Sequence, residues 1–249
     1  MKSHLLALLA SCLISVAAQA APTVHIVGDS TVCIWPASAY PKMGWGQVVG
    51  RLFASGTVLI DDKAVSGTSS KSFYDNSNEW VPVRNTIKSG DYVFIQFGHN
   101  DEKVGQSGST DPFTTYQQYL TKYIDETRAR GGFPILVTPV ERNKWSGGKI
   151  VASHGNYPAA MRALAASKNV PLVDLTARST ANYQSHGENY TTNNIFMNLA
   201  AGAFPNYPNG NTDNTHFQEN GANIISKLVT DGVRAETHAE MKTLAGFLK

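Results

Sequence analysis

Serine, histidine, aspartate and asparagine side chains stand in four short blocks of the sequence, and together they could support nucleophilic catalysis by a serine. A serine hydroxyl is a weak nucleophile at neutral pH, so it needs a base, a group that orients the base, and donors for an oxyanion. Ser30 lies in VHIVGDSTVC, directly after an apolar run, where open α/β sheets place their ligands. The alternative is that Asp29 or Ser30 only caps the next helix through its side-chain oxygen.

A candidate base and its orienting acid stand near the other end of the chain. In TDNTHFQENGA, Asp213 comes three residues before His216. This spacing lets the carboxylate reach the imidazole Nδ1 proton and leaves Nε2 to accept the serine proton. The same residues could instead form a turn that Asp213 caps, with His216 in solvent.

Two further blocks offer candidate donors for an oxyanion. FIQFGHNDE ends an apolar run with His99, Asn100 and Asp101, and the Asn100 amide could donate a hydrogen bond to the oxyanion. DDKAVSGTSSKSF contains Gly67, whose missing Cβ would let a backbone N–H approach a substrate closely. Either block could equally be an ordinary turn.

Short apolar runs alternate with longer amphipathic stretches, which predicts a parallel sheet of about five strands with helices on both faces. The runs are TVHIV, TVLID, DYVFIQF, PILVTP and VPLVDL. Helices are predicted over residues 44–55, 112–131, 157–169, 219–236 and 236–249, with Gly131 and Gly132 as a stop and the last helix packed on its own chain. Residues 181–215 predict a surface excursion with a weak helix near 194–204. Since the strands end at one edge, the four blocks are expected to meet in one crevice.

Length and composition fit one domain over residues 21–249, after a secretory signal over residues 1–20. The 249-residue chain is 42% hydrophobic and 16% charged, and its net charge of +2 gives no field that would gather nucleic acid or anionic lipid. Lys2, an apolar run and AQA before Ala21 are typical of a cleaved signal, so the mature protein is expected to be secreted and free of membranes. LASC at Cys12 leaves a lipoprotein as the alternative. Loss of Cys12 leaves Cys33 without an internal disulfide partner.

The four blocks resemble those of the SGNH hydrolases, also called GDSL-type esterases, in their order and their spread over the chain. They are GDST with Ser30, SGTSS with Gly67, GHND with Asn100, and DNTH with Asp213 and His216. The resemblance implies Ser30 as nucleophile, His216 as base and Asp213 as the acid that orients it. It also implies an oxyanion hole of the Ser30 and Gly67 amides and the Asn100 side chain, a three-layer α/β/α flavodoxin-like fold, and no metal or cofactor.

Within that superfamily, several segments are similar to the rhamnogalacturonan acetylesterase group, whose members remove acetyl groups from plant cell-wall polysaccharide. These segments are GDST, GWG at 44–46, TPVER at 138–142 and THFQENGA. The group resemblance implies a carbohydrate esterase that acts on acetylated pectin. With the secretory signal, the protein is expected to be secreted, and it is also expected to be a monomer. Asn143 stands where many relatives carry a second arginine, which leaves the sugar chain open.

The excursion is rich in asparagine and tyrosine, which suits a sugar better than a long acyl tail. Aromatic side chains that could face sugar rings, or could simply pack, are Trp45, Trp145, Tyr183, Tyr190 and Tyr207. Arg142 could meet a uronate carboxylate with its planar fork, or could pair with Glu141 or Asp101.

Other functions stay open beside pectin deacetylation. They are an acetylxylan esterase, a lipase or lysophospholipase relative, and a noncatalytic carbohydrate-binding protein. The sequence has no G-x-S-x-G elbow of the α/β-hydrolases and no G-x-x-x-x-G-K-[ST] phosphate loop of a nucleotide binder.

Overall fold

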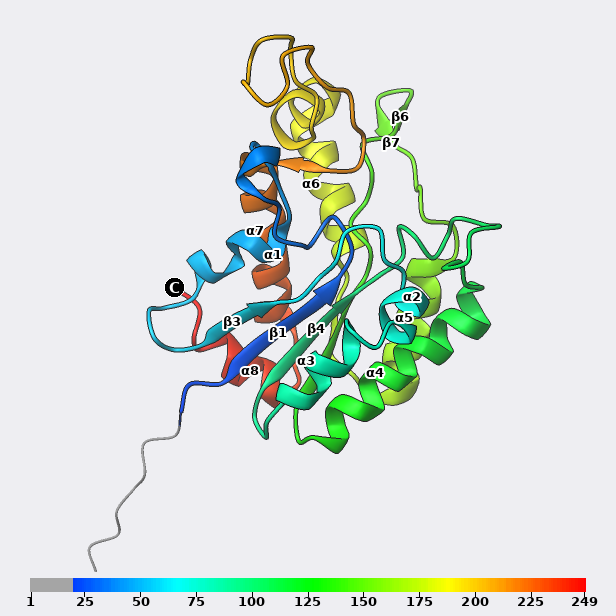
Figure 1. Ribbon diagram of the computed structural model, residues 1–249, viewed down its shortest axis with the longest axis vertical. Helices are drawn as coiled ribbons and strands as arrows, with labels where there is room; N and C mark the ends of the chain where they lie inside the picture. Colours follow the sequence, from blue (N-terminus) through cyan, green and yellow to red (C-terminus); the bar gives the residue numbers. More distant parts are fainter. Residues whose placement is uncertain (1–19) are drawn as a thin grey trace, which may run out of the picture.

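A five-stranded parallel sheet forms the centre of the computed structural model, which describes residues 20–249 (Figure 1). The strand order is β3-β1-β4-β5-β8. The strands are β1 (Thr23–Gly28), β3 (Leu59–Asp62), β4 (Tyr92–Gln96), β5 (Phe133–Val137) and β8 (Leu172–Val173). The predicted strands and the α/β/α fold class are confirmed. Apart from Ala20, the predicted signal and its alternative at Cys12 lie outside the described residues.

Helices cover both faces of the sheet, because successive side chains of a strand point to opposite faces. Along β1, Val24 and Ile26 enter one apolar core and Val27 enters the other. The first core is covered by α1 (Trp45–Val49), α6 (Leu175–Tyr190), α7 (Glu219–Ala235) and α8 (Ala239–Ala245). The second is covered by α2 (Ser70–Asp75), α3 (Trp80–Thr86), α4 (Gln117–Ala129) and α5 (Tyr157–Lys168).

The predicted helices are present, but three of them are shorter than expected, among them the last, which covers only Ala239–Ala245. Helix α1 ends at Val49 and continues as a 3₁₀ turn over Gly50–Leu52. Helix α4 follows a π-helical turn over Pro112–Tyr116 and ends before Gly131, whose φ of +77° lies in the region that favours glycine. The predicted glycine stop is therefore confirmed.

The prediction for residues 181–215 needs two corrections. Helix α6 begins directly after β8, capped by the Asp174 side chain, and runs to Tyr190 before a π-helical turn over Thr191–Ile195. The weak helix predicted near 194–204 is absent. Phe196 instead forms an antiparallel bridge with Phe217, and the Met197 N–H donates to the His216 carbonyl at 2.8 Å. Those pairings use backbone groups that a helix would need, and they hold the His216 segment.

Short strand pairs join loops that are far apart in sequence. Strands β2 (Lys42–Met43) and β9 (Phe217–Gln218) pair antiparallel, so the segment after Ser30 lies beside the segment after His216. Strands β6 (Trp145–Ser146) and β7 (Lys149–Ile150) form a hairpin above the sheet (Figure 1). Gly44 explains part of the GWG motif, since a Cβ there would lie 2.2 Å from the Val32 carbonyl oxygen.

The C-terminal helix packs on its own chain, as predicted. Met241 and Leu244 of α8 are fully buried in the first core, and the Phe247 carbonyl accepts a hydrogen bond from the Ala54 N–H at 2.8 Å. Over residues 20–249, none of the helices has the length and apolar character needed to cross a membrane.

Candidate active site

Ser30 stands in a tight turn at the end of β1. The Asp29 carbonyl accepts hydrogen bonds from the Val32 and Cys33 N–H groups, and the Asp29 side chain accepts from the Thr31 N–H at 2.9 Å and hydroxyl at 2.8 Å. Asp29 therefore stabilises this turn, and neither Asp29 nor Ser30 caps a helix, because a turn and not a helix follows Ser30. The Ser30 hydroxyl is left to bond elsewhere, and the residue is 8% exposed.

The Ser30 hydroxyl meets His216, and His216 meets Asp213. His216 Nε2 lies 2.8 Å from Ser30 Oγ, and His216 Nδ1 lies 2.7 Å from Asp213 Oδ2. The other oxygen of Asp213 accepts from the Thr215 N–H at 2.8 Å and the His216 N–H at 3.0 Å. The Asp213 carboxylate thus caps the turn with one oxygen and contacts the His216 ring with the other. The turn thereby orients the carboxylate toward the ring.

Asp213 is held in its ionised form. Burial opposes the charge, but hydrogen bonds from the His216 ring and from the Thr215 and His216 N–H groups outweigh it, and the pKa of Asp213 falls to about 2. An ionised carboxylate at Nδ1 fixes the proton on that nitrogen and leaves Nε2 as the acceptor that faces the serine. The geometry therefore suits transfer of a proton from Ser30 Oγ to His216 Nε2.

Gly67 and Asn100 lie at the same edge of the sheet, on the loops after β3 and β4. Gly67 has a φ of +85°, and a Cβ built there would meet no atom within 4 Å. The Asn100 amide donates through Nδ2 to the Thr68 carbonyl at 2.8 Å, and Thr68 Oγ1 donates to the Gly28 carbonyl at 3.2 Å. One of the two Nδ2 hydrogens of Asn100 is used in this way, and the other is free to donate.

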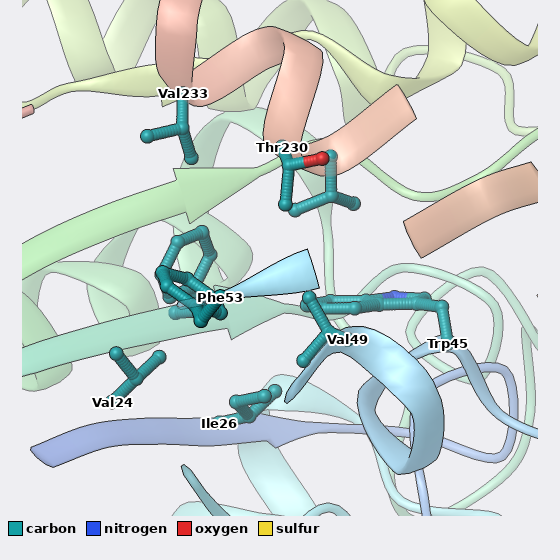
Figure 2. A pocket seen from close by; sticks show the side chains of 9 residues that line it. Val24, Ile26, Trp45, Val49, Phe53, Thr230 and Val233 are labelled. Atoms are coloured by element: carbon teal, nitrogen blue, oxygen red, sulfur yellow. The ribbon is translucent and has the colours of Figure 1, made fainter. Parts of the chain in front are cut away.

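Trp45 does not lie where a sugar could reach it. The residue is fully buried and its indole N–H donates to Gln96 Oε1 at 2.8 Å. Together with Ile26 and Val49 it lines a small apolar pocket of the first core (Figure 2). The prediction of a sugar contact at Trp45 is therefore wrong, because GWG packs into the core rather than over the site. Tyr183 is fully buried as well.

Trp145, Tyr190 and Tyr207 keep partly open surfaces. The Trp145 indole N–H donates to Asn143 Oδ1 at 2.7 Å on the β6–β7 hairpin, and the Tyr207 hydroxyl donates to the Ala39 carbonyl at 3.0 Å. Tyr190 is 37% exposed and stacks on His186. Sugar contact stays a prediction for these three.

Arg142 lies at the site but is bonded to protein groups. Its Nη1 donates to Thr215 Oγ1 at 2.6 Å, its Nη2 donates to Glu102 Oε1 at 2.6 Å, and its side chain is 18% exposed. The ion-pair partner is thus Glu102. Glu141 contacts Arg142 through a hydrogen bond from the Arg142 backbone N–H, and the Asp101 carboxylate accepts from the Ser70 N–H instead.

Trp35 is a contact of the site that the sequence reasoning missed. Its indole N–H donates to the Ser30 carbonyl at 3.0 Å, and its ring lies 5.6 Å from the His216 ring in an edge-on arrangement. Lys42 Nζ lies 4.5 Å from the centroid of the Trp35 ring. The available signal was an aromatic residue five positions after the candidate nucleophile in the same loop.

Among the residues that the structure describes, no group of three or more His, Cys, Asp or Glu side chains is arranged to hold a metal ion. Cys33 is a buried free thiol, and burial together with the nearby Asp62 raises its pKa to about 12. A thiol held neutral in this way is a poor nucleophile beside Ser30.

The parallel sheet and the polar groups at its edge define a hydrolase of the SGNH type. The chain belongs to the GDSL-like Lipase/Acylhydrolase family, whose model matches residues 26–223, and it is a carboxylic ester hydrolase. The predicted family is therefore confirmed.

The chain is also similar to individual proteins over most of its length. The chain is 41% identical to rhamnogalacturonan acetylesterase RhgT of Bacillus subtilis (strain 168), over 84% of this chain and 88% of that one. It is 36% identical to the probable rhamnogalacturonan acetylesterase YesY of the same organism, over 85% and 92% of the two chains. The crystal structure of YxiM from Bacillus subtilis matches with a TM-score of 0.74 at 25% identity, over 86% of this chain and 56% of that one.

Proposed function

We propose that this protein is a secreted serine esterase that removes acetyl groups from plant cell-wall polysaccharide, with acetylated rhamnogalacturonan as the favoured substrate. The observation that carries the proposal is the line from Asp213 Oδ2 through His216 to Ser30 Oγ, with distances of 2.7 and 2.8 Å. The similarity to RhgT and YesY supports the choice of substrate.

In the first half of the proposed reaction, Ser30 Oγ attacks the acetyl carbonyl carbon and His216 Nε2 takes the hydroxyl proton. The carbonyl oxygen becomes an oxyanion, which the Ser30 and Gly67 N–H groups and the free Asn100 Nδ2 hydrogen stabilise. The intermediate then collapses. The sugar oxygen leaves with the proton from His216, and the acetyl group stays on Ser30.

In the second half, water attacks the acetyl-enzyme and gives its proton to His216. A second oxyanion forms in the same place and collapses to acetic acid, while His216 returns the proton to Ser30 Oγ. One water is consumed, and one sugar hydroxyl and one acetic acid are formed. Asp213 stays ionised throughout and stabilises the charged imidazole.

The chemistry is tested with Ser30→Ala on p-nitrophenyl acetate. The rate of hydrolysis is expected to fall to a small fraction of the wild-type rate, since the nucleophile is gone. Ser226→Ala is the matched control, because Ser226 is also buried but donates to the Trp45 carbonyl in the core. A folded Ser30→Ala protein with wild-type hydrolysis would end the esterase mechanism at this serine, and polysaccharide binding without inhibitor labelling would favour a noncatalytic binder.

The substrate is tested by acetate release from acetylated rhamnogalacturonan, homogalacturonan and xylan. Release is expected to be fastest from rhamnogalacturonan. Faster release from xylan would make the protein an acetylxylan esterase, and activity that rises from acetate to octanoate esters would indicate a lipase or lysophospholipase.

Secretion and assembly need their own measurements. N-terminal sequencing of protein from the culture medium or periplasm is expected to begin at Ala21, and light scattering is expected to give a monomer. A lipid-modified N-terminus at Cys12 would contradict the first expectation.

A further inference from the structure

The Arg142 guanidinium joins two loops of the proposed site. One nitrogen donates to Thr215 Oγ1, and Thr215 stands between Asp213 and His216. The other donates to Glu102 Oε1, and Glu102 stands two residues after Asn100. The same nitrogen also lies 3.4 Å from the His99 carbonyl. A single side chain thus connects the loop that carries Asp213 and His216 to the loop that carries Asn100.

The Glu102 carboxylate that accepts from Arg142 is itself held in place by a buried histidine. Its second oxygen lies 2.9 Å from His154 Nδ1, and His154 Nε2 lies 2.8 Å from the Val140 carbonyl. His154 is 2% exposed. Burial disfavours the charge on Glu102, but the hydrogen bonds from His154 and Arg142 outweigh it and lower its pKa. Arg142 therefore faces an ionised carboxylate that is itself fixed in place.

The loop between Asp213 and His216, which Arg142 also contacts, is held by several hydrogen bonds. The Thr215 hydroxyl accepts from Arg142 and lies 2.8 Å from Asn214 Oδ1, and the Asn143 N–H donates to the Asn214 carbonyl at 2.8 Å. The pair Arg142 and Asn143 thus holds residues 214 and 215, which lie directly between the acid and the base. Arg142 is the only one of these restraints that also reaches the loop after β4.

We propose that Arg142 is a positioning residue. It holds the loop that carries Asp213 and His216 in the position where His216 Nε2 contacts Ser30 Oγ. The inference rests on the proposed function, and it gives the arginine a role other than the predicted contact with a uronate carboxylate. Both ends of its fork are already bonded and most of its surface is buried. A displacement of about 1 Å between reacting groups costs about 100-fold in rate, so a tie of this kind acts on kcat.

The test uses p-nitrophenyl acetate, which carries no carboxylate for an arginine to bind. Arg142→Met is expected to lower kcat about 10- to 100-fold with KM within about twofold of wild type. Arg142→Lys keeps the charge but loses the planar guanidinium, so its kcat is expected to lie between those of wild type and Arg142→Met. Arg84→Lys is the matched control, because Arg84 also pairs with a partly buried glutamate, Glu126, but on helices α3 and α4. Its kcat is expected to equal that of wild type.

Thr215→Val separates positioning from folding. It removes the Oγ1 that Arg142 bonds and keeps the Arg142–Glu102 ion pair, so the protein is expected to fold and to lose about three- to tenfold in kcat. Wild-type kcat in both Arg142→Met and Thr215→Val would overturn the proposal. So would an Arg142→Met protein that loses affinity for a uronate polymer and keeps normal kinetics on the aryl ester, because the arginine would then be a substrate contact.

A proton NMR measurement keeps the inference separate from the esterase activity. The proton between His216 Nδ1 and Asp213 is expected to give a far-downfield resonance in wild type and in Ser30→Ala, and to broaden or vanish in Arg142→Met and Thr215→Val. A wild-type protein without esterase activity would defeat the proposed function alone. An unchanged resonance in both loop variants would defeat the positioning role alone.

Discussion

The Lys103 ammonium lies 2.6 Å from the Asn100 amide oxygen, while the Asn100 nitrogen donates to the Thr68 carbonyl. The two bonds decide which end of the amide faces the site. Lys103→Met is expected to lower kcat on p-nitrophenyl acetate about three- to tenfold, equivalent to about 1 kcal/mol, with KM unchanged. Lys227→Met is the control, since Lys227 is an exposed lysine of α7 that pairs with Asp231. Equal kcat values for the two variants would show that Lys103 does not orient the amide.

Asn100→Ala removes the proposed donor itself. If the free Nδ2 hydrogen stabilises the oxyanion, kcat on p-nitrophenyl acetate is expected to fall about 10²- to 10³-fold, while KM changes little. The partly buried Thr68 carbonyl also loses its partner, so the thermal midpoint is measured alongside the kinetics. A folded Asn100→Ala protein with less than tenfold loss would leave the oxyanion to backbone groups.

Asp213→Asn tests the orienting acid. An amide presents an N–H donor as readily as an acceptor and stabilises the wrong form of the imidazole, so kcat is expected to fall about 10⁴-fold. Steady-state kinetics on the aryl acetate measure the loss. Wild-type kinetics in the asparagine variant would remove Asp213 from the mechanism.

The same variant is expected to change how stability depends on pH. The pKa of Asp213 is lowered from 3.8 to about 2 in the folded protein, so between those values the unfolded chain binds more protons. The stability that the carboxylate supplies is complete above about pH 4 and is lost as the pH falls toward 2. The gap in thermal midpoint between wild type and Asp213→Asn is therefore expected to narrow over that window. A gap that stays constant would mean that the carboxylate gains nothing from its bonds.

The sequence predicted where polar groups would gather, but not how they would be held. Ser30, Gly67 and Asn100 each follow a strand, and parallel strands must end at one edge, so their common location follows from connectivity. Aromatic character alone does not report burial, and Trp45 was misjudged for that reason. The bonds of Arg142 to Thr215 and Glu102 depend on the lateral distance between loops, which no spacing along the chain encodes. The helix predicted near 194–204 failed because bridges to Phe217 and Asn211 outweighed local propensity.

Asp62, at the end of β3, is a buried carboxylate that the proposed mechanism does not use. Its Oδ1 accepts from the Ala64 N–H, but Oδ2 is buried and has no hydrogen-bond partner among the described residues. A Cβ on Gly46 would lie 2.5 Å from Oδ2, which shows how closely α1 covers it. Burial and, less strongly, repulsion from Asp61 raise the pKa of Asp62 from 3.8 to about 7.

Asp62→Asn is expected to stabilise the protein above about pH 7. Between pH 3.8 and about 7 the folded state of the wild type binds more protons than the unfolded state, so stability from this group falls as the pH rises through that window. The asparagine has no charge to bury, and its free energy of unfolding at pH 8 is expected to exceed that of wild type by about 1–3 kcal/mol. The difference should vanish near pH 4. Asp61→Asn is the control, since Asp61 pairs with His25 and Lys63 and its loss is expected to give no such gain. Thermal unfolding of the three proteins at pH 4 and pH 8 measures the effect, and equal midpoints for wild type and Asp62→Asn at pH 8 would contradict it.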